Sequence, residues 1–211
     1  MHALLLIDIQ NDFMPFGSLP VPLGDEVVGV ANVLAPLHEL VVATQDWHPA
    51  EHGSFASNHR NAEPGETVVL GGVDQVLWPD HCVQDAPGAS FHSGLDIAHV
   101  DIVVRKGTDS AIDSYSGFRD NGHQRDTGLA SILQERGVGS VALVGLATDY
   151  CVKYTALDGI ALGLRVSVVE DGVRAVDLAS GDGAASLAEL RAAGCEIVSL
   201  AGALARADHR R

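Results

Sequence analysis

The segment that decides the fold is Ser140-Val-Ala-Leu-Val-Gly-Leu-Ala-Thr-Asp-Tyr-Cys-Val-Lys153. It begins with a short apolar run rich in valine, which is typical of a buried parallel strand. Gly145 interrupts this run, and Thr148 and Asp149 are suitable N-cap residues for a helix that follows. The sequence therefore predicts that Cys151 lies in the first turn of a helix, just beyond the carboxyl end of a strand.

Cys151 has two readings at such a turn. Free backbone N–H groups and the positive end of the helix dipole would lower the pKa of its thiol and could hold an oxyanion. A buried structural cysteine is the commoner fate of a free cysteine. The strand, the glycine and the capped helix together favour a nucleophile.

Composition limits the classes of protein to consider. The chain has 211 residues, which fits one domain spanning residues 1–211, and its net charge of −15 argues against binding to nucleic acid. No stretch approaches the roughly 20 apolar residues needed to span a bilayer, so we expect no membrane partner. Three scattered cysteines do not make a disulfide framework. We therefore expect a reducing, cytoplasmic setting, and the oligomeric state stays open.

Predicted strands alternate with predicted helices along the chain. Strands are expected at 3–9, 40–44, 101–105, 140–144, 165–169 and 196–200, and helices at 25–39, 127–136, 151–162 and 183–193. Residues 49–92 show little periodicity and are rich in turn formers, which is typical of a functional excursion. The alternation predicts an α/β fold with a doubly wound, mainly parallel sheet and helices on both faces.

Four chemically capable residues follow four different predicted strands, namely Asp8, Asp46, Lys106 and Cys151. Sites in such sheets form outside the carboxyl ends of the strands, so these side chains should meet. A carboxylate can take the proton of a thiol, and a nearby lysine would keep both groups ionised. Asp8 and Lys106 could equally form a structural ion pair, and the spacing alone does not decide between these readings.

Asp46 and His48 form a candidate metal site. Alternate residues of an extended segment face the same side, so both side chains could reach one ion. His81 is our choice for the third ligand, and such a set leaves positions open for water or substrate. The alternative is that these are surface histidines, because the chain has ten histidines and the pattern Asp-x-His is common.

Three aromatic residues, Phe13, Trp78 and Tyr115, lie in irregular segments rather than in helices or strands. They could wall a flat, apolar ligand pocket, or they could cover the core beneath long loops. Cys82 is a rival nucleophile beside His81, but no strand-to-helix turn precedes it. Cys195 is interpreted as structural.

Taken together, these motifs resemble the nicotinamidases, also called pyrazinamidases, of the isochorismatase-like cysteine hydrolase superfamily. The resemblance runs essentially end to end. It rests on Asp8-Ile-Gln-Asn-Asp-Phe13, Gln45-Asp-Trp-His-Pro49, His52-Gly-Ser-Phe-Ala56, Trp78-Pro-Asp-His-Cys-Val83, Arg105-Lys-Gly107, Asp113-Ser-Tyr-Ser116, Asp120-Asn-Gly122 and Gly145-Leu-Ala-Thr-Asp-Tyr-Cys-Val152.

The resemblance implies the isochorismatase-like hydrolase fold and a metal-dependent amidohydrolase. Such an enzyme converts nicotinamide to nicotinate and ammonia, and pyrazinamide to pyrazinoate. The reaction passes through a thioester intermediate and belongs to NAD salvage. Cys151 would be the nucleophile, Asp8 the general base and Lys106 its charge-stabilising partner. The amides of Ala147 and Cys151 would form the oxyanion hole, with a cis peptide joining Leu146 to Ala147.

The resemblance also implies the ligand sites. Asp46, His48 and His81 match the metal ligands, with His52 as an additional candidate, and the divalent ion would be zinc first, with iron or manganese as alternatives. The ring of nicotinamide would lie between Phe13, Trp78 and Tyr115.

Two departures and two alternatives accompany this interpretation. Pro15-Phe16 and the residues Gly117 and Arg119 differ from the usual pattern, and they are expected to flank the pocket mouth. A sister cysteine hydrolase acting on another small amide, such as an N-carbamoyl compound, is the nearer alternative. A non-catalytic metal-binding module on the same scaffold is the other.

Overall fold

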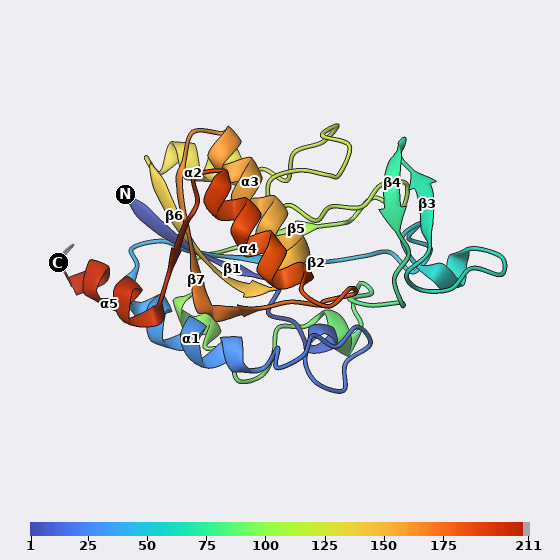
Figure 1. Cartoon of the computed structure of the whole chain (residues 1–211), viewed down its shortest axis with the longest axis horizontal. Helices are drawn as coiled ribbons and strands as arrows, with labels where there is room; N and C mark the ends of the chain where they lie inside the picture. The colour runs from blue at the N-terminus through green and yellow to red at the C-terminus, as the bar shows by residue number, and fades with distance from the viewer. Residues whose placement is uncertain (209–211) are drawn as a thin grey trace.

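The computed structural model describes residues 1–208 and contains a six-stranded sheet in which all neighbouring strands run parallel (Figure 1). Across the sheet the order is β5 (Ile102–Lys106), β2 (Val41–Asp46), β1 (His2–Ile7), β6 (Ser140–Leu146), β7 (Arg165–Arg174) and β8 (Glu196–Val198). The direction of winding changes between β1 and β6, which are hydrogen-bonded neighbours. The crevice beyond the carboxyl ends of these two strands is the place where such sheets bind ligands.

Helices cover both faces of the sheet, as predicted (Figure 1). One face carries α1 (Glu26–Leu34) and α5 (Leu200–Asp208), and the other carries α2 (Leu129–Glu135), α3 (Lys153–Ala161) and α4 (Asp182–Ala192). Strand β1 supplies both cores, because alternate side chains of a strand point to opposite faces. Leu4 and Leu6 pack on the α1 side, and Leu5 and Ile7 on the other. The doubly wound fold is thereby confirmed.

The observed boundaries differ from the predicted ones by a few residues at several elements. The expected helix over 25–39 ends at Leu34 and continues as a 3-10 turn over Ala35–Leu37, because Pro36 cannot continue the α-helical hydrogen bonding. Strand β7 is longer than predicted and runs to Arg174. Helix α5 has no counterpart among the predicted elements.

The long excursion over residues 49–92 is more regular than its sequence indicates. It contains an antiparallel hairpin of β3 (Thr67–Leu70) and β4 (Val73–Val76), which projects from the body beyond the carboxyl ends of the strands (Figure 1). Short 3-10 turns at Ala56–Asn58 and Pro87–Ala89 complete it. Within residues 1–208, no helix combines the length and the apolar character that crossing a bilayer demands.

Candidate active site

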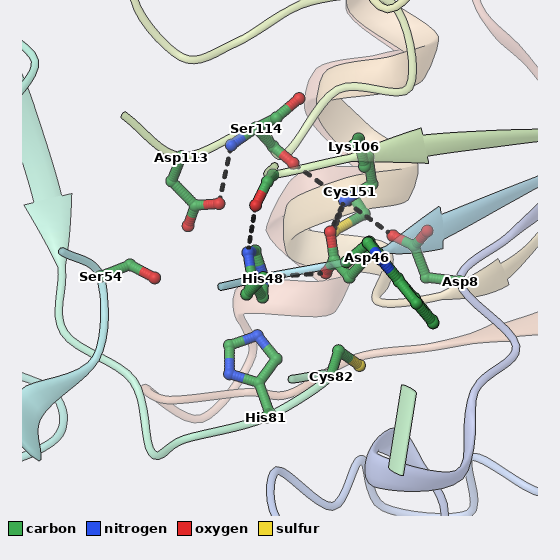
Figure 2. Close-up of polar contacts among 12 residues, drawn as sticks. Asp8, Asp46, His48, Ser54, His81, Cys82, Lys106, Asp113, Ser114 and Cys151 are labelled. Atoms are coloured by element: carbon green, nitrogen blue, oxygen red, sulfur yellow. Dashed lines mark hydrogen bonds and ion pairs between the residues drawn. The ribbon is translucent and has the colours of Figure 1, made fainter. Parts of the chain in front are cut away.

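The four residues predicted to meet at the carboxyl edge of the sheet do so around the ammonium group of Lys106 (Figure 2). Its Nζ atom lies 2.9 Å from Asp8 Oδ2, 2.6 Å from Asp46 Oδ1 and 3.4 Å from Cys151 Sγ. The carbonyl oxygen of Ser114 accepts a further hydrogen bond from Nζ at 2.9 Å. All four predicted side chains are buried. The ion pair of Asp8 with Lys106 and the cluster of thiol, carboxylate and ammonium groups are therefore present together in the same site.

The cysteine turn differs from the predicted capped α-helix. Residues Thr148–Val152 form a π-helical turn that leads into α3, and the peptide between Leu146 and Ala147 is cis, as the resemblance implied. The predicted capping role of Thr148 and Asp149 is wrong, since no side chain caps this turn. The carboxylate of Asp149 instead accepts hydrogen bonds from the backbone N–H groups of Val176 and Asp177, at 3.0 and 2.9 Å. These bonds tie the cysteine turn to the loop after β7.

The prediction of a lowered pKa for the Cys151 thiol is also wrong. Burial raises the pKa of this thiol well above its usual value, and the ammonium of Lys106 offsets only part of that effect. The carboxylate of Asp8 raises it further. The resting sulfur is therefore a protonated thiol, and it needs a base within the site.

Asp8 is suited to be that base. Burial raises the pKa of its carboxyl group to about 6, even though Lys106 acts in the opposite direction. The hydroxyl of Thr44 donates to Asp8 Oδ1 at 2.6 Å and orients the carboxylate. Burial alone would lower the pKa of Lys106, but Asp46 and Asp8 hold it well above its usual value. The lysine therefore stays charged while Asp8 can gain and lose a proton near neutral pH.

The candidate metal ligands converge beside this cluster. Asp46, His48 and His81 each offer one ligand atom, and these atoms lie within 4.8 Å of one another. The Nδ1 atom of His48 is hydrogen-bonded to Gly107 O, and that of His81 to Pro79 O, each at 2.8 Å. Each ring is thus oriented through its Nδ1 atom, which leaves Nε2 for an ion.

Within residues 1–208, His48 Nε2 is buried without a hydrogen-bond partner. Its charged neighbour Asp46 Oδ2 lies 3.7 Å away, beyond hydrogen-bond distance. A buried nitrogen without a hydrogen bond is costly unless something binds it. One carboxylate and two imidazoles suit zinc, iron or manganese, so the residues present fit a divalent ion.

His52 lies next to this set, but its ring is held by a side-chain hydroxyl and not by a backbone carbonyl. Its ring centroid is 4.4 Å from that of His48, and its Nδ1 atom is hydrogen-bonded to Ser54 Oγ at 2.7 Å. Its Nε2 atom, like that of His48, is buried without a hydrogen-bond partner in the described chain. Ligand atoms of His48, His52 and Asp113 also lie within 4.8 Å of one another. Asp113 belongs to a motif quoted above, but its sequence context gave it no role.

The predicted aromatic residues line one pocket with the thiol. The full lining consists of Phe13, Leu19, Asp46, Trp78, His81, Asp113, Tyr115, Ala147, Tyr150, Cys151 and Val176. Trp78 Nε1 donates to the hydroxyl of Tyr115 at 3.1 Å, and the rings of Trp78 and Tyr150 pack edge to face at 4.8 Å. Tyr150 was missed, although its position beside Cys151 could have indicated it. Such a wall fits a small flat ring.

The remaining candidates lie outside this pocket. Cys82 is fully buried, burial raises the pKa of its thiol, and it does not line the pocket. Gly117 and Arg119 do not line it either, and Arg119 forms an ion pair with Asp158. Phe16 is fully exposed at a turn with a φ of 74°.

Comparison with known proteins identifies the class to which this fold and this site belong. The family model of the isochorismatase domain matches residues 2–202 of this chain. The chain belongs to the isochorismatase family.

Its relatives within that family carry a more specific name. A nicotinamidase of Escherichia coli (strain K12) is 46% identical over 204 residues, covering 95% of each chain. The structure of an Acinetobacter baumanii nicotinamidase/pyrazinamidase is 42% identical, with a TM-score of 0.92, and covers 95% of this chain and 96% of that one. The zinc complex of a Pyrococcus horikoshii pyrazinamidase is 37% identical, with a TM-score of 0.76, and covers 94% and 98%.

Proposed function

We propose that this chain is a nicotinamidase, an amidohydrolase that converts nicotinamide to nicotinate and ammonia and serves the recycling of nicotinamide into NAD. The observation that carries the proposal is the contact of Lys106 Nζ with Asp8, Asp46 and Cys151, of which Asp46 and Cys151 line a pocket with aromatic walls. The identity to nicotinamidases over nearly the whole chain supports the same substrate. Pyrazinamide, which has the same ring size and the same carboxamide, is the second substrate.

The reaction begins with the transfer of the thiol proton from Cys151 to Asp8. The sulfur then forms a bond to the carboxamide carbon, and the carbonyl oxygen becomes an oxyanion. Lys106 stabilises the negative charge that arises on the sulfur, because its own pKa is held high by its two carboxylate neighbours. A buried thiol with a raised pKa loses its proton to a base more easily when a cation contacts the sulfur.

Two backbone N–H groups, those of Ala147 and Cys151, are proposed to hold the oxyanion. Both residues line the pocket, and both belong to the turn after β6. Oriented donors of this kind stabilise charge that develops in the transition state without having to reorient. Collapse of the intermediate breaks the carbon–nitrogen bond, and Asp8 returns its proton to the leaving nitrogen. Ammonia departs and a thioester to Cys151 remains.

Hydrolysis of the thioester uses the same base. Asp8, again ionised, removes a proton from a water molecule as its oxygen attacks the thioester carbon. The carbon–sulfur bond breaks and the sulfur recovers the proton from Asp8. The carboxylic acid that forms loses its remaining acidic proton to solvent and leaves as nicotinate. Because the pKa of Asp8 is raised to about 6, one carboxyl group can act as base and acid in turn.

A divalent ion is proposed to bind to Asp46, His48 and His81, with His52 as an additional candidate. When bound, it supplies a Lewis acid that orients the pyridine nitrogen of the substrate and withdraws electrons from the ring. Zinc is proposed first, since the donor set suits it and the Pyrococcus horikoshii relative binds it. The ring is proposed to lie between Phe13, Trp78 and Tyr115, which line the pocket.

The experiment that tests this function measures ammonia release from nicotinamide. It compares the protein as purified, after removal of metal by a chelator, and after the addition of single divalent metals. We expect activity to disappear on chelation and to return with metal. A folded, reduced and metal-loaded protein that releases no ammonia from nicotinamide would refute the proposal and would favour a sister hydrolase of another small amide.

Cys151→Ala is the matched control. It should abolish ammonia release while the metal content stays that of the unsubstituted protein, because the proposed metal ligands are Asp46, His48 and His81. Turnover near the unsubstituted level would remove Cys151 from the mechanism. Cys195→Ala, which changes a buried thiol away from the pocket, should leave turnover unchanged.

A further inference from the structure

Asp113 is a carboxylate in the pocket wall to which the mechanism gives no task. It lies just before Ser114 in the segment after β5, is 3% exposed and lines the pocket that contains Cys151 (Figure 2). Its Oδ1 atom accepts a hydrogen bond from the backbone N–H of Ser114 at 2.7 Å, and its Oδ2 atom accepts one from Gln75 Nε2 at 3.2 Å. Within residues 1–208, no lysine or arginine forms an ion pair with it.

The partner that holds Asp113 is itself fixed by neutral groups. Gln75 of strand β4 is fully buried, and its Nε2 atom also donates to the hydroxyl of Tyr115 at 2.8 Å. The side chain of Asn121 donates to Gln75 Oε1 at 3.1 Å, and its own oxygen accepts the N–H of Tyr115. The hairpin thereby fixes the carboxylate of Asp113 without neutralising its charge. A buried charge held in this manner is costly unless it serves the site.

The charges around the pocket balance only when Asp113 is included. Of the buried carboxylates, Asp46 and Asp113 line the pocket and Asp8 lies beside Cys151, and the buried cation among them is Lys106. Three carboxylates and one ammonium leave a surplus of two negative charges, which is the charge that one divalent ion neutralises. Without Asp113, the same site with its ion bound would carry a net positive charge.

We propose that Asp113 is a specificity residue that makes the pocket favour a neutral carboxamide over the anionic carboxylate formed from it, and that it thereby speeds the release of product. This inference rests on the proposed function. A neutral amide gains or loses little from the charge of Asp113. An anionic product is repelled by it, and the repulsion between two like charges in a partly dry pocket is worth at least about a tenfold change in affinity.

The experiment compares the binding of nicotinamide and nicotinate by calorimetry at pH 8. All proteins carry Cys151→Ala, so that nicotinamide is not consumed, and all are loaded with the same metal to equal measured occupancy. Asp113→Asn and Asp113→Ser each remove the charge. Asp74→Asn is the matched control, because it removes one negative charge from the exposed side of β4, next to Gln75 and outside the pocket lining.

We expect both Asp113 variants to bind nicotinate at least about tenfold more tightly while their affinity for nicotinamide changes by less than threefold. Pyrazinoate and pyrazinamide should follow the same pattern, and Asp74→Asn should change neither affinity. An equal change in both affinities, or no change in the affinity for nicotinate, overturns the proposal. This result is distinct from a failure of the proposed function, in which the unsubstituted, metal-loaded protein hydrolyses no nicotinamide.

Discussion

The Nζ atom of Lys106 lies 3.4 Å from the Sγ atom of Cys151, and the same ammonium group forms ion pairs with two buried carboxylates. The lysine enters from β5 at one edge of the sheet, whereas the cysteine follows β6 at the other side of β1. The contact therefore exists only because the strands are parallel and end at the same edge. A thiolate that forms at Cys151 is therefore in contact with the ammonium group of Lys106, which is already charged.

Lys106→Met should be destabilising and nearly inactive. The substitution leaves Asp8 and Asp46 buried without their common cation, which costs about 3 kcal/mol of the free energy of unfolding. Loss of the cation beside the sulfur should lower kcat/KM at least about a hundredfold. Denaturant unfolding at neutral pH and ammonia release measure the two effects.

Lys153→Met is the control for Lys106→Met. Lys153 begins α3 and forms an ion pair with Glu189 at the surface, where a single pair is worth at most about 1 kcal/mol. Its replacement should change neither stability nor kcat/KM appreciably. If Lys106→Met were as stable and as active as Lys153→Met, the central role of the ammonium group would be disproved.

The dependence of kcat/KM on pH should report the ionisation of Asp8. Its carboxyl group acts as a base only when ionised, and burial raises its pKa to about 6. Protonation therefore removes the base as the pH falls through about 6, and kcat/KM should decline about tenfold per pH unit below that value. Ammonia release measured between pH 5 and 8 on metal-loaded protein tests this expectation.

Asp8→Asn is the control for that profile. It retains the shape of the side chain but cannot take the thiol proton, so kcat/KM should be lost at every pH in the range. A variant that kept the activity and the acidic limb of the unsubstituted protein would assign the limb to another group.

The fold was predictable because it depends on patterns within short segments. Apolar runs such as 140–144 alternate with amphipathic stretches, and that alternation alone implies parallel strands whose carboxyl ends meet. The same rule brought Asp8, Asp46, Lys106 and Cys151 to one edge, where the structure has them. The residues of the cluster could therefore be named before any distance was known.

Other features of the site depend on contacts between segments far apart in the sequence. Asp149 looked like a helix cap, but its oxygens bind the N–H groups of Val176 and Asp177. The pKa of Cys151 could not be predicted from its turn, because burial by the surrounding segments outweighs the local effects. Gln75 reaches Asp113 from a hairpin that the sequence did not indicate. Such contacts carry no periodic signal in the chain.

Gln10 was also missed, and it should control metal affinity. Its Nε2 atom donates to Asp46 O and its Oε1 atom accepts from Asp46 N, each at 2.8 Å, so the side chain holds both backbone groups of a proposed ligand. Gln10→Ala should loosen Asp46 and weaken binding of a divalent ion at least about tenfold. Competition with a chromogenic chelator measures this affinity without reference to turnover.

Gln45→Ala is the matched control for Gln10→Ala. Both side chains are buried and both donate to Ala89 O at 2.9 Å, but no hydrogen bond joins the Gln45 side chain to Asp46 in the described chain. Its metal affinity should stay within threefold of that of the unsubstituted protein. Equal losses in the two variants would show that general loosening, and not the support of Asp46, explains the effect.

Gly145→Ala should disturb the pairing of β1 with β6 next to the candidate active site. Gly145 lies in β6 with a φ of 132°, and a Cβ atom there would lie 2.0 Å from the carbonyl oxygen of Ile7 in β1. Neither backbone can give way, because the two strands are paired along their length. The substitution should therefore lower the free energy of unfolding by about 3 kcal/mol or more.

Gly139→Ala is the matched control, because a Cβ atom there meets nothing within 4 Å, and it should leave the free energy of unfolding nearly unchanged. Denaturant unfolding of both variants measures the difference, and equal stability would contradict the close approach of β1 and β6 on which the positions of Asp8 and Cys151 depend.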